Sequence, residues 1–147
     1  MKLTLYTDYS LRVLMYLALD PDNTSTIQEI ADHYNVSKNH LMKVAYELGQ
    51  SGYVETVRGR NGGLRLAKPA AEINLGELVR ECEEDFTLVE CFDAGNNQCV
   101  LTPACKLKHV LKEALENYFH SLNQYSLADL LQHRKSMARL LAIDLTV

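Results

Sequence analysis

The chain has 147 residues, 47% of them hydrophobic and 23% charged, with a formal net charge of −4, a size that allows one packed core. No apolar stretch approaches the ~20 residues that span a bilayer, and the first residues lack the pattern of a secretion signal, so we expect a cytoplasmic protein without membrane contact. No catalytic arrangement of Ser, His and Asp, no phosphate-binding loop and no paired carboxylates stand out, so we do not expect an enzyme.

The first part of the chain predicts a helix-turn-helix. Residues 9–19 form an apolar helix that ends at a turn over residues 20–23. Residues 27–34 place their apolar side chains on one helical face, and Ser37 is a good N-cap for a further amphipathic helix. The apolar positions of these two helices are Ile27, Ile30, Ala31 and Tyr34, then Leu41, Val44, Ala45 and Leu48. Two short amphipathic helices joined by a tight turn are typical of a helix-turn-helix.

A β-hairpin is predicted directly after the second amphipathic helix. Residues 53–57 predict one strand and residues 64–66 its partner. The glycine-rich turn between them carries Arg58 and Arg60 at its tip. A hairpin in this position is the wing of a winged helix-turn-helix.

The rest of the chain is predicted to be helical on both sides of a polar loop. Asn74 is the N-cap of a fourth helix, which carries Cys82 on its apolar face. Thr102 and Pro103 predict the N-cap and first residue of a long helix, and Ser126 predicts the start of a last helix. The apolar stripe of the long helix consists of Leu107, Leu111, Ala114, Tyr118 and Leu122. The predicted fold is therefore mainly α, with a small β-hairpin wing.

The polar face of the second amphipathic helix is the first candidate DNA-binding site. Asn39 and His40 can hydrogen-bond base edges in the major groove, and Lys43 can reach a guanine or a phosphate. Ser37 and Lys38, at the start of the helix, suit phosphate contacts. Any surface helix has a solvated polar face, which is the alternative interpretation. The attached turn and wing favour DNA.

The wing is the second candidate DNA-binding site. Its glycines allow Arg58 and Arg60 to approach a narrow minor groove, and we include Asn61 of the same turn. The alternative is a flexible charged turn. Residues 36–68 carry six basic residues against two acidic ones, which favours phosphate contacts. The basic residues are Lys38, Lys43, Arg58, Arg60, Arg65 and Lys68, and the acidic ones are Glu47 and Glu55.

Three cysteines lie close together in the polar loop, and they are candidate metal ligands. Cys91, Cys99 and Cys105 follow no secretion signal, so ligation explains them better than disulfides do. Thiolates suit zinc and iron–sulfur clusters, and a place for Cys105 in the first turn of the long helix favours the thiolate. The alternative is three separate reduced thiols. The fourth ligand stays open among His109, Asp93 and a residue elsewhere, and local spacing does not choose between zinc and iron–sulfur.

Four of these features together resemble the Rrf2 family of transcriptional regulators. They are residues 6–12 (YTDYSLR), residues 37–41, the wing over residues 58–64, and the three cysteines. The resemblance extends to about residue 135 and is strongest to the nitric-oxide-sensing repressors of the family. It implies a homodimer joined by the long helix, with an iron–sulfur cluster bound by the three cysteines.

Asp8 bears on the type of cluster that the resemblance implies. In the nitric-oxide-sensing branch, an aspartate at this position in the partner subunit is the fourth ligand of a 4Fe–4S cluster. The iron–sulfur-homeostasis branch instead uses a histidine three residues after the last cysteine. Lys108 occupies that position here, and His109 follows it. The resemblance therefore implies a 4Fe–4S cluster, with 2Fe–2S as the alternative.

We expect a cluster-dependent repressor that binds operator DNA as a homodimer and is released when nitric oxide nitrosylates the cluster. The alternatives are a 2Fe–2S regulator of cluster assembly or redox stress, and a regulator with a purely structural zinc site. Residues 1–70 are the expected DNA-binding domain, and residues 71–102 the linking helix and cluster loop. Residues 103–147 are expected to hold the dimerisation helix and a C-terminal helix that packs back on the first domain.

Overall fold

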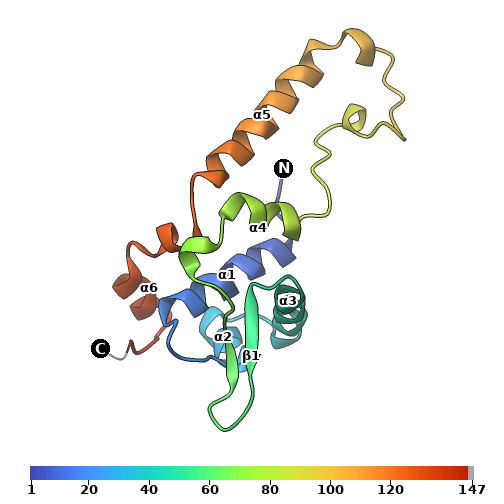
Figure 1. The fold of residues 1–147 in the computed structure, drawn as a ribbon. Coiled ribbons are helices and arrows are strands. Elements are labelled where there is room, and N and C mark those ends of the chain that lie inside the picture. The colour runs from blue at the N-terminus through green and yellow to red at the C-terminus, as the bar shows by residue number, and fades with distance from the viewer. Residues whose placement is uncertain (146–147) are drawn as a thin grey trace.

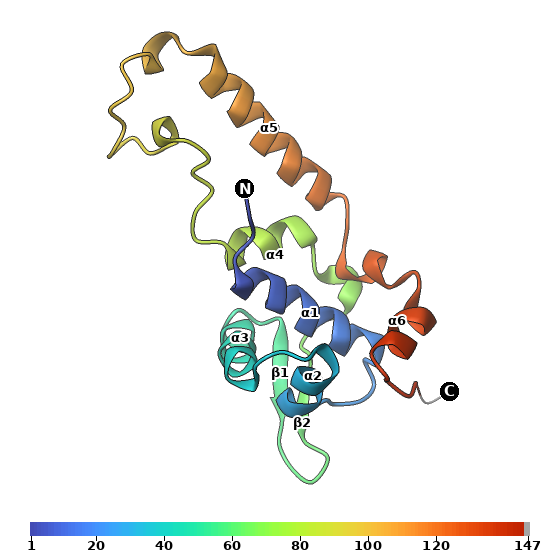
Figure 2. The same ribbon diagram turned by 180° about the vertical axis from the view of Figure 1, so that it is seen from behind.

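The computed structural model describes residues 1–145, which form α-helices, short 3-10 helices and one two-stranded hairpin that projects from one end of the molecule (Figures 1 and 2). The α-helices are α1 Leu5–Leu19, α2 Ile27–Tyr34, α3 Lys38–Gln50, α4 Leu75–Cys82, α5 Lys106–Asn123 and α6 Arg134–Leu140. The strands are β1 Val54–Val57 and β2 Gly63–Leu66. Short 3-10 helices are η1 Ala70–Glu72, η2 Glu90–Phe92, η3 Thr102–Ala104 and η4 Leu127–Leu131. The predicted mainly α fold with a hairpin wing is confirmed.

Helix α1 begins at Leu5, four residues earlier than the sequence predicts. Thr4 is its N-cap, and the Thr4 hydroxyl oxygen accepts a hydrogen bond from the backbone N–H of Thr7 at 3.2 Å. This side-chain cap satisfies one of the free N–H groups of the first turn. Asp8 therefore lies inside the first turns of the helix, and its expected place before the helix was wrong.

Helices α1, α2 and α3 form the core of the first part of the chain. Thr26 and Glu29 form a reciprocal capping box at the start of α2, and Asn35 ends that helix in a left-handed conformation with φ 51°. The tight turn brings α3 against α1, where Leu14 and Leu41 are almost fully buried. The remaining buried apolar side chains of this unit include Val13, Leu17, Ile30, Val44 and Leu48. The predicted helix-turn-helix is confirmed.

The wing is an antiparallel hairpin in which Val54 pairs with Leu66 and Val57 with Gly63. Ser25, in the segment before α2, adds a bridge to Leu64 through hydrogen bonds of 3.0 and 2.8 Å. Gly59 has a φ of +114°, which favours glycine because it lacks a Cβ. The hairpin extends away from the helices as the lowest feature in Figure 1.

Helix α4 joins the first unit to α5. Asn74 caps α4 as predicted, because its side-chain oxygen accepts hydrogen bonds from the N–H groups of Gly76 and Glu77 at 2.9 and 3.1 Å. The Asn74 side-chain amide also donates to the carbonyl of Asn123 at 2.9 Å. One residue therefore both caps α4 and attaches the end of α5.

Substituting Gly76 with alanine is expected to destabilise the chain by about 1–3 kcal/mol through overpacking. A Cβ at this position would lie 1.8 Å from Oδ1 and 3.1 Å from the backbone nitrogen of Asn123. Urea unfolding measures the change. Gly49→Ala is the matched control, because its Cβ would meet only the Val54 carbonyl at 3.9 Å, and the better helix former should raise stability slightly. Equal stability of the two variants would show that the α4–α5 contact is loose.

Helix α5 projects from the body of the molecule on the side opposite the wing, as both ribbon views show (Figures 1 and 2). Phe119, near its end, is its one fully buried residue, stacked edge-on with Phe86 at a centroid distance of 4.7 Å. Leu107 and Val110 are exposed. Thr102 and Pro103 form the separate turn η3, so α5 begins at Lys106 and its predicted start was three residues too early.

The segment after α5 returns to the first unit. Ser126 caps the 3-10 helix η4 rather than a longer helix, and α6 follows as a separate helix that the sequence did not indicate. The Leu127 side chain is fully buried, and the Arg134 guanidinium donates to the carbonyl of Leu19 at 2.6 Å. Both contacts hold the C-terminal elements against α1.

Candidate DNA-binding surface and candidate metal centre

Helix α3 exposes the five residues that the sequence assigns to DNA. Its buried side packs on α1 and α2, so the opposite side faces solvent. Ser37, Lys38, Asn39, His40 and Lys43 are all exposed. Of the basic groups, Lys43 has a loose ion pair with Glu47 at 3.8 Å. A helix surface with free amide, imidazole and ammonium groups has the donors and acceptors needed for bases and phosphates.

Tyr9 extends this surface onto α1, and sequence reasoning missed it. Its ring lies 6.2 Å from the ring of His40, centroid to centroid. The contact holds the imidazole at the junction of α1 and α3. The motif containing Tyr9 was visible in the sequence, but its proximity to His40 follows only from the packing of the two helices.

The wing presents Arg58, Arg60 and Asn61 on its exposed turn. Within residues 1–145 neither arginine forms an ion pair. The backbone carbonyl of Asn61 accepts a hydrogen bond from the Thr24 hydroxyl at 2.7 Å, which attaches the turn to the segment before α2. Arg65, further down the strand, is paired with Glu55. The free positive charge of the hairpin is therefore at its tip.

The three candidate metal ligands lie along the segment between α4 and α5. Cys91 is half-buried in η2, Cys99 is exposed in the following loop, and Cys105 is the half-buried N-cap of α5. Cys105 thus precedes the first turn in which the sequence placed it. All three thiols are free. In the described part of a single chain, no three His, Cys, Asp or Glu side chains are gathered closely enough to hold a metal ion.

The loop around Cys99 has its own hydrogen bonds. The Cys99 N–H donates to the side-chain oxygen of Asn97 at 3.1 Å, and the Thr102 hydroxyl donates to the Cys99 carbonyl at 2.8 Å. Asp93 closes a separate turn by accepting from Asn96 and from the Gly95 N–H, which lowers the pKa of its carboxyl. Its two oxygens are engaged in that turn, which weighs against Asp93 as the fourth ligand.

Cys82 differs from the other cysteines. It lies on the buried face of α4, and burial raises the pKa of its thiol. A buried neutral thiol is a structural side chain rather than a ligand. Its predicted place in the core is confirmed.

The Asp8 carboxylate is bound by Arg12 within the same chain. Both carboxylate oxygens take part, at 3.2 Å to Nε and 2.9 Å to Nη2. The guanidinium lies over the rings of Tyr9 and Tyr34 at 5.7 and 5.8 Å, and the Tyr34 hydroxyl donates to the Arg12 carbonyl at 3.1 Å. Asp8 is therefore connected through one arginine to both helices α1 and α2.

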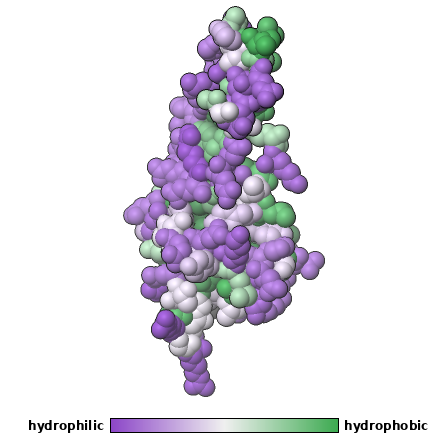
Figure 3. Space-filling model, turned by 90° about the vertical axis from the view of Figure 1, so that its right-hand side faces the viewer, coloured by the Kyte–Doolittle hydropathy of each residue, from purple (hydrophilic) through white to green (hydrophobic). Residues whose placement is uncertain are grey.

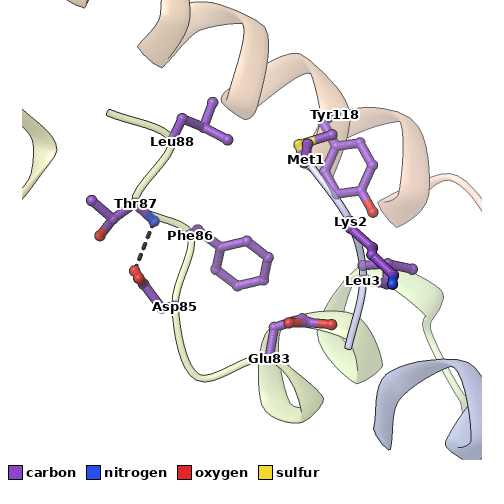
Figure 4. Close-up of a pocket in the computed structure, with 9 residues that line it drawn as sticks. All are labelled: Met1, Lys2, Leu3, Glu83, Asp85, Phe86, Thr87, Leu88 and Tyr118. Carbon is purple, nitrogen blue, oxygen red and sulfur yellow. Dashed lines mark hydrogen bonds between the residues drawn. The ribbon is translucent and has the colours of Figure 1, made fainter. Parts of the chain in front are cut away.

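Glu83 links the start of α1 to the root of the cysteine loop, a contact that the sequence did not indicate. The backbone N–H and the hydroxyl of Thr4 both donate to Oε1 of Glu83, at 2.7 and 3.1 Å. Beside them lies a hollow of about 270 Å³ between residues 1–3, the loop and α5. Figure 4 shows the Phe86 ring pointing toward the N-terminal residues. The hydrogen bonds between Thr4 and Glu83 therefore connect the start of the cysteine loop to the N-cap of α1.

A winged helix-turn-helix with an exposed recognition helix and a basic wing defines a DNA-binding regulator. The chain belongs to the Rrf2 family, because the model of that family, described as "Iron-dependent Transcriptional regulator", matches residues 3–133. The chain is 57% identical over 142 residues to the HTH-type transcriptional regulator NsrR of Bacillus subtilis (strain 168), covering 96% of this chain and 97% of that one. It is 56% identical over 143 residues to NsrR of Bacillus licheniformis, covering 97% of this chain and all of that one.

Solved structures support the same fold. CymR of B. subtilis, described as the global cysteine regulator, has a TM-score of 0.72 at 22% identity, covering 90% of this chain and 98% of that one. IscR of T. potens has a TM-score of 0.73 at 22% identity, covering 90% and 88%. The curated relatives are named as transcriptional regulators, which confirms that the chain is not an enzyme. None of the helices in residues 1–145 has the length and apolar character to span a membrane.

Proposed function

We propose that the chain is an iron–sulfur-cluster-dependent transcriptional repressor of the cytoplasm that binds operator DNA as a homodimer. Nitric oxide is its signal, and nitrosylation of the cluster releases it from DNA. The observation that carries this proposal is the near-full-length identity to regulators named NsrR in a chain whose loop holds three reduced thiols. Residues 1–70, 71–102 and 103–147 are the proposed DNA-binding, cluster-loop and dimerisation parts.

The donor set fits an iron–sulfur cluster. Cys91, Cys99 and Cys105 would hold it, with Asp8 of the partner subunit as the fourth ligand of a 4Fe–4S type. Thiolates are the usual ligands of such clusters. Cys105, the N-cap residue of α5, makes no side-chain capping hydrogen bond, so the first N–H groups of the helix are free to donate to a ligating sulfur there. A bound cluster would supply the iron that reacts with nitric oxide.

Competition for the Asp8 carboxylate supports a link between ligation and DNA binding. In the single chain both oxygens are held by Arg12. Ligation would withdraw the carboxylate from the guanidinium, which also contacts Tyr34 on α2. Loss of that ligation would return Asp8 to Arg12 and shift α1 against the helix-turn-helix. The recognition helices of a dimer would then lose their register on the operator.

The Thr4–Glu83 contact supplies a second route from the loop to the DNA-binding unit. Glu83 is the C-cap residue of α4, at the start of the segment that leads to the cysteines. Movement of this segment would pull on the N-cap of α1, in the same helix that carries Asp8. Both routes therefore end in α1.

Helix α5 supports the proposed homodimer. Its outer half has exposed Leu107 and Val110 and half-buried Leu111 and Leu115, and within residues 1–145 the main packing of α5 is on α4. Figure 3 shows hydrophobic side chains at the end of the molecule farthest from the wing. An apolar helix side of this kind is stabilised by a second copy, as in other helical dimers.

Replacing Arg58 and Arg60 together with alanine is expected to weaken operator binding and to make its salt dependence shallower. Each phosphate contact contributes about one unit to the slope of log affinity against log salt, so the slope should fall by about two. Fluorescence anisotropy over a salt series measures it. Arg65→Ala is the control, because Glu55 already neutralises Arg65. An unchanged slope in the double variant would place the wing away from the DNA.

Purification without oxygen tests the proposed cofactor. The protein should be brown, and native mass spectrometry should count about four iron and four sulfide per protomer. Two of each would favour the 2Fe–2S alternative, and zinc alone would remove the sensor function. Nitric oxide should then release a labelled operator duplex from the loaded protein. Equal operator affinity of the cluster-free protein would overturn control by the cluster.

A further inference from the structure

Helix α3 exposes two large apolar side chains on the face assigned to DNA. Met42 is 50% and Tyr46 68% exposed, although the remainder of that face is polar or basic. Asn39 and Tyr46 are seven residues apart, so they lie on the same line along the helix. The buried side of α3 is on the opposite side of the helix. Met42 and Tyr46 therefore point away from the core, beside Asn39 and Lys43.

Neither side chain belongs to the packed core of residues 1–145. Within residues 1–145, Tyr46 makes no ring–ring contact, whereas Tyr9, Tyr16, Tyr34 and Tyr118 all do. The two residues lie outside the hydrophobic core and outside the set of partly buried side chains that pack against it. Exposing large apolar side chains in water is unfavourable, so a bound partner would explain them best.

The composition of α3 identifies the chemistry of that partner. The helix has no arginine, which together with lysine is the side chain that most often reads guanine. It offers Asn39, whose amide pairs with adenine, and two apolar groups of the kind that contact the thymine methyl group. Lys38 and Lys43 flank them with positive charge, which complements a phosphate backbone rather than an apolar protein surface.

We infer that Met42 and Tyr46 are specificity-determining residues that contact thymine methyl groups in the major groove of the operator half-site. The inference rests on the proposed binding of operator DNA and names the base pairs that α3 reads. Met42 and Tyr46 are one turn apart, so they would contact neighbouring base pairs. The half-site under α3 is accordingly rich in A·T pairs.

Exchange of single thymines for uracil tests the inference, because uracil lacks only the C5 methyl group and keeps every hydrogen-bonding group. The probe is a fluorescein-labelled duplex selected from a random-sequence library with the full-length protein, purified without oxygen. Its thymines are replaced one at a time, and the Kd is measured by anisotropy. At one or two positions of each half-site the Kd should rise about fourfold. This is the change in affinity expected when one methyl-sized apolar group is no longer buried.

Variants of α3 test whether the change in Kd on uracil exchange depends on the side chains of Met42 and Tyr46. In Met42→Ala or Tyr46→Ala protein, the uracil exchange at the matching position should no longer change the Kd, as in a double-mutant cycle. Tyr46→Phe keeps the ring and should keep the preference for thymine. Lys43→Ala is the matched control, and it should raise the Kd for the thymine-containing and the uracil-containing duplex by the same factor. Both apolar side chains are exposed, so their replacement should leave the fold intact, as circular dichroism can verify.

This design distinguishes failure of the proposed DNA-binding function from failure of the inference about Met42 and Tyr46. If the library yields no bound duplex, the proposed DNA-binding function fails. If duplexes bind but no uracil exchange changes the Kd, the inference is overturned. Discrimination between thymine and uracil that persists in Met42→Ala and Tyr46→Ala protein also overturns it, because other residues would then contact the methyl groups.

Discussion

Cys99→Ala protein is expected to fold but to retain almost no iron, whereas about four iron atoms per protomer are expected in the unchanged protein. Cys99 is exposed in the loop and contributes only backbone groups to the hydrogen bonds there, so its thiol is available for ligation and unnecessary for folding. Operator affinity should fall about tenfold, within the usual range of coupling between two sites. Iron analysis and anisotropy with one operator duplex measure the two effects.

Cys82→Ala supplies the matched control for this prediction. Its thiol is buried on α4, so its loss should cost about 1 kcal/mol of unfolding free energy and leave the iron content unchanged. Full iron content in Cys99→Ala protein, together with normal release by nitric oxide, would mean that Cys99 is not a ligand.

Asp8→Ala protein is expected to keep a cluster on its three cysteines but to lose most of the communication between that cluster and DNA. The ratio of operator affinities with and without the cluster should fall from about tenfold to near one, because the carboxylate proposed to link the two sites is gone. The Asp8–Arg12 ion pair is partly exposed, so its contribution to stability is small and the variant should fold. Parallel titrations of loaded and cluster-free protein measure this ratio.

The reaction with nitric oxide gives an independent measurement on the same variant. A three-thiolate site should change the number of nitric oxide molecules consumed per cluster, or the rate of the first step, as absorbance titration would show. Asp22→Ala provides a charge-matched control in the exposed turn after α1. An unchanged cluster type, reaction stoichiometry and affinity ratio in Asp8→Ala protein would contradict a ligand role for Asp8.

The elements that the sequence predicted well are those with a strong local pattern. Helices α2 and α3 have four apolar residues each at helical spacing, and glycines mark the turn of the hairpin. The less successful predictions concern the ends of elements. Thr4 as the cap of α1 and Cys105 as the cap of α5 were both missed, because backbone N–H groups can be satisfied by several nearby residues and only packing selects among them.

The candidate DNA-binding residues were found from the sequence, whereas the contacts that connect them to the loop were not. The exposed polar face of α3 follows from the positions of its apolar residues. In contrast, Glu83 is separated from Thr4 by 79 positions, and Tyr34 from Arg12 by 22. No local pattern indicates such pairs, since they form only when α1, α2 and α4 are packed together.

By itself, the sequence determined the class of fold, the recognition face of α3, the charged wing and the three thiols of one loop, because each depends on residue type and spacing over a few turns. The tertiary structure alone decided that Asp8 is held by Arg12 and that Glu83 joins the loop root to the cap of α1. It also decided that Leu107 and Val110 of α5 are exposed within the described residues of one chain. These features depend on side chains far apart in the sequence, whose meeting is set by the burial of a shared core.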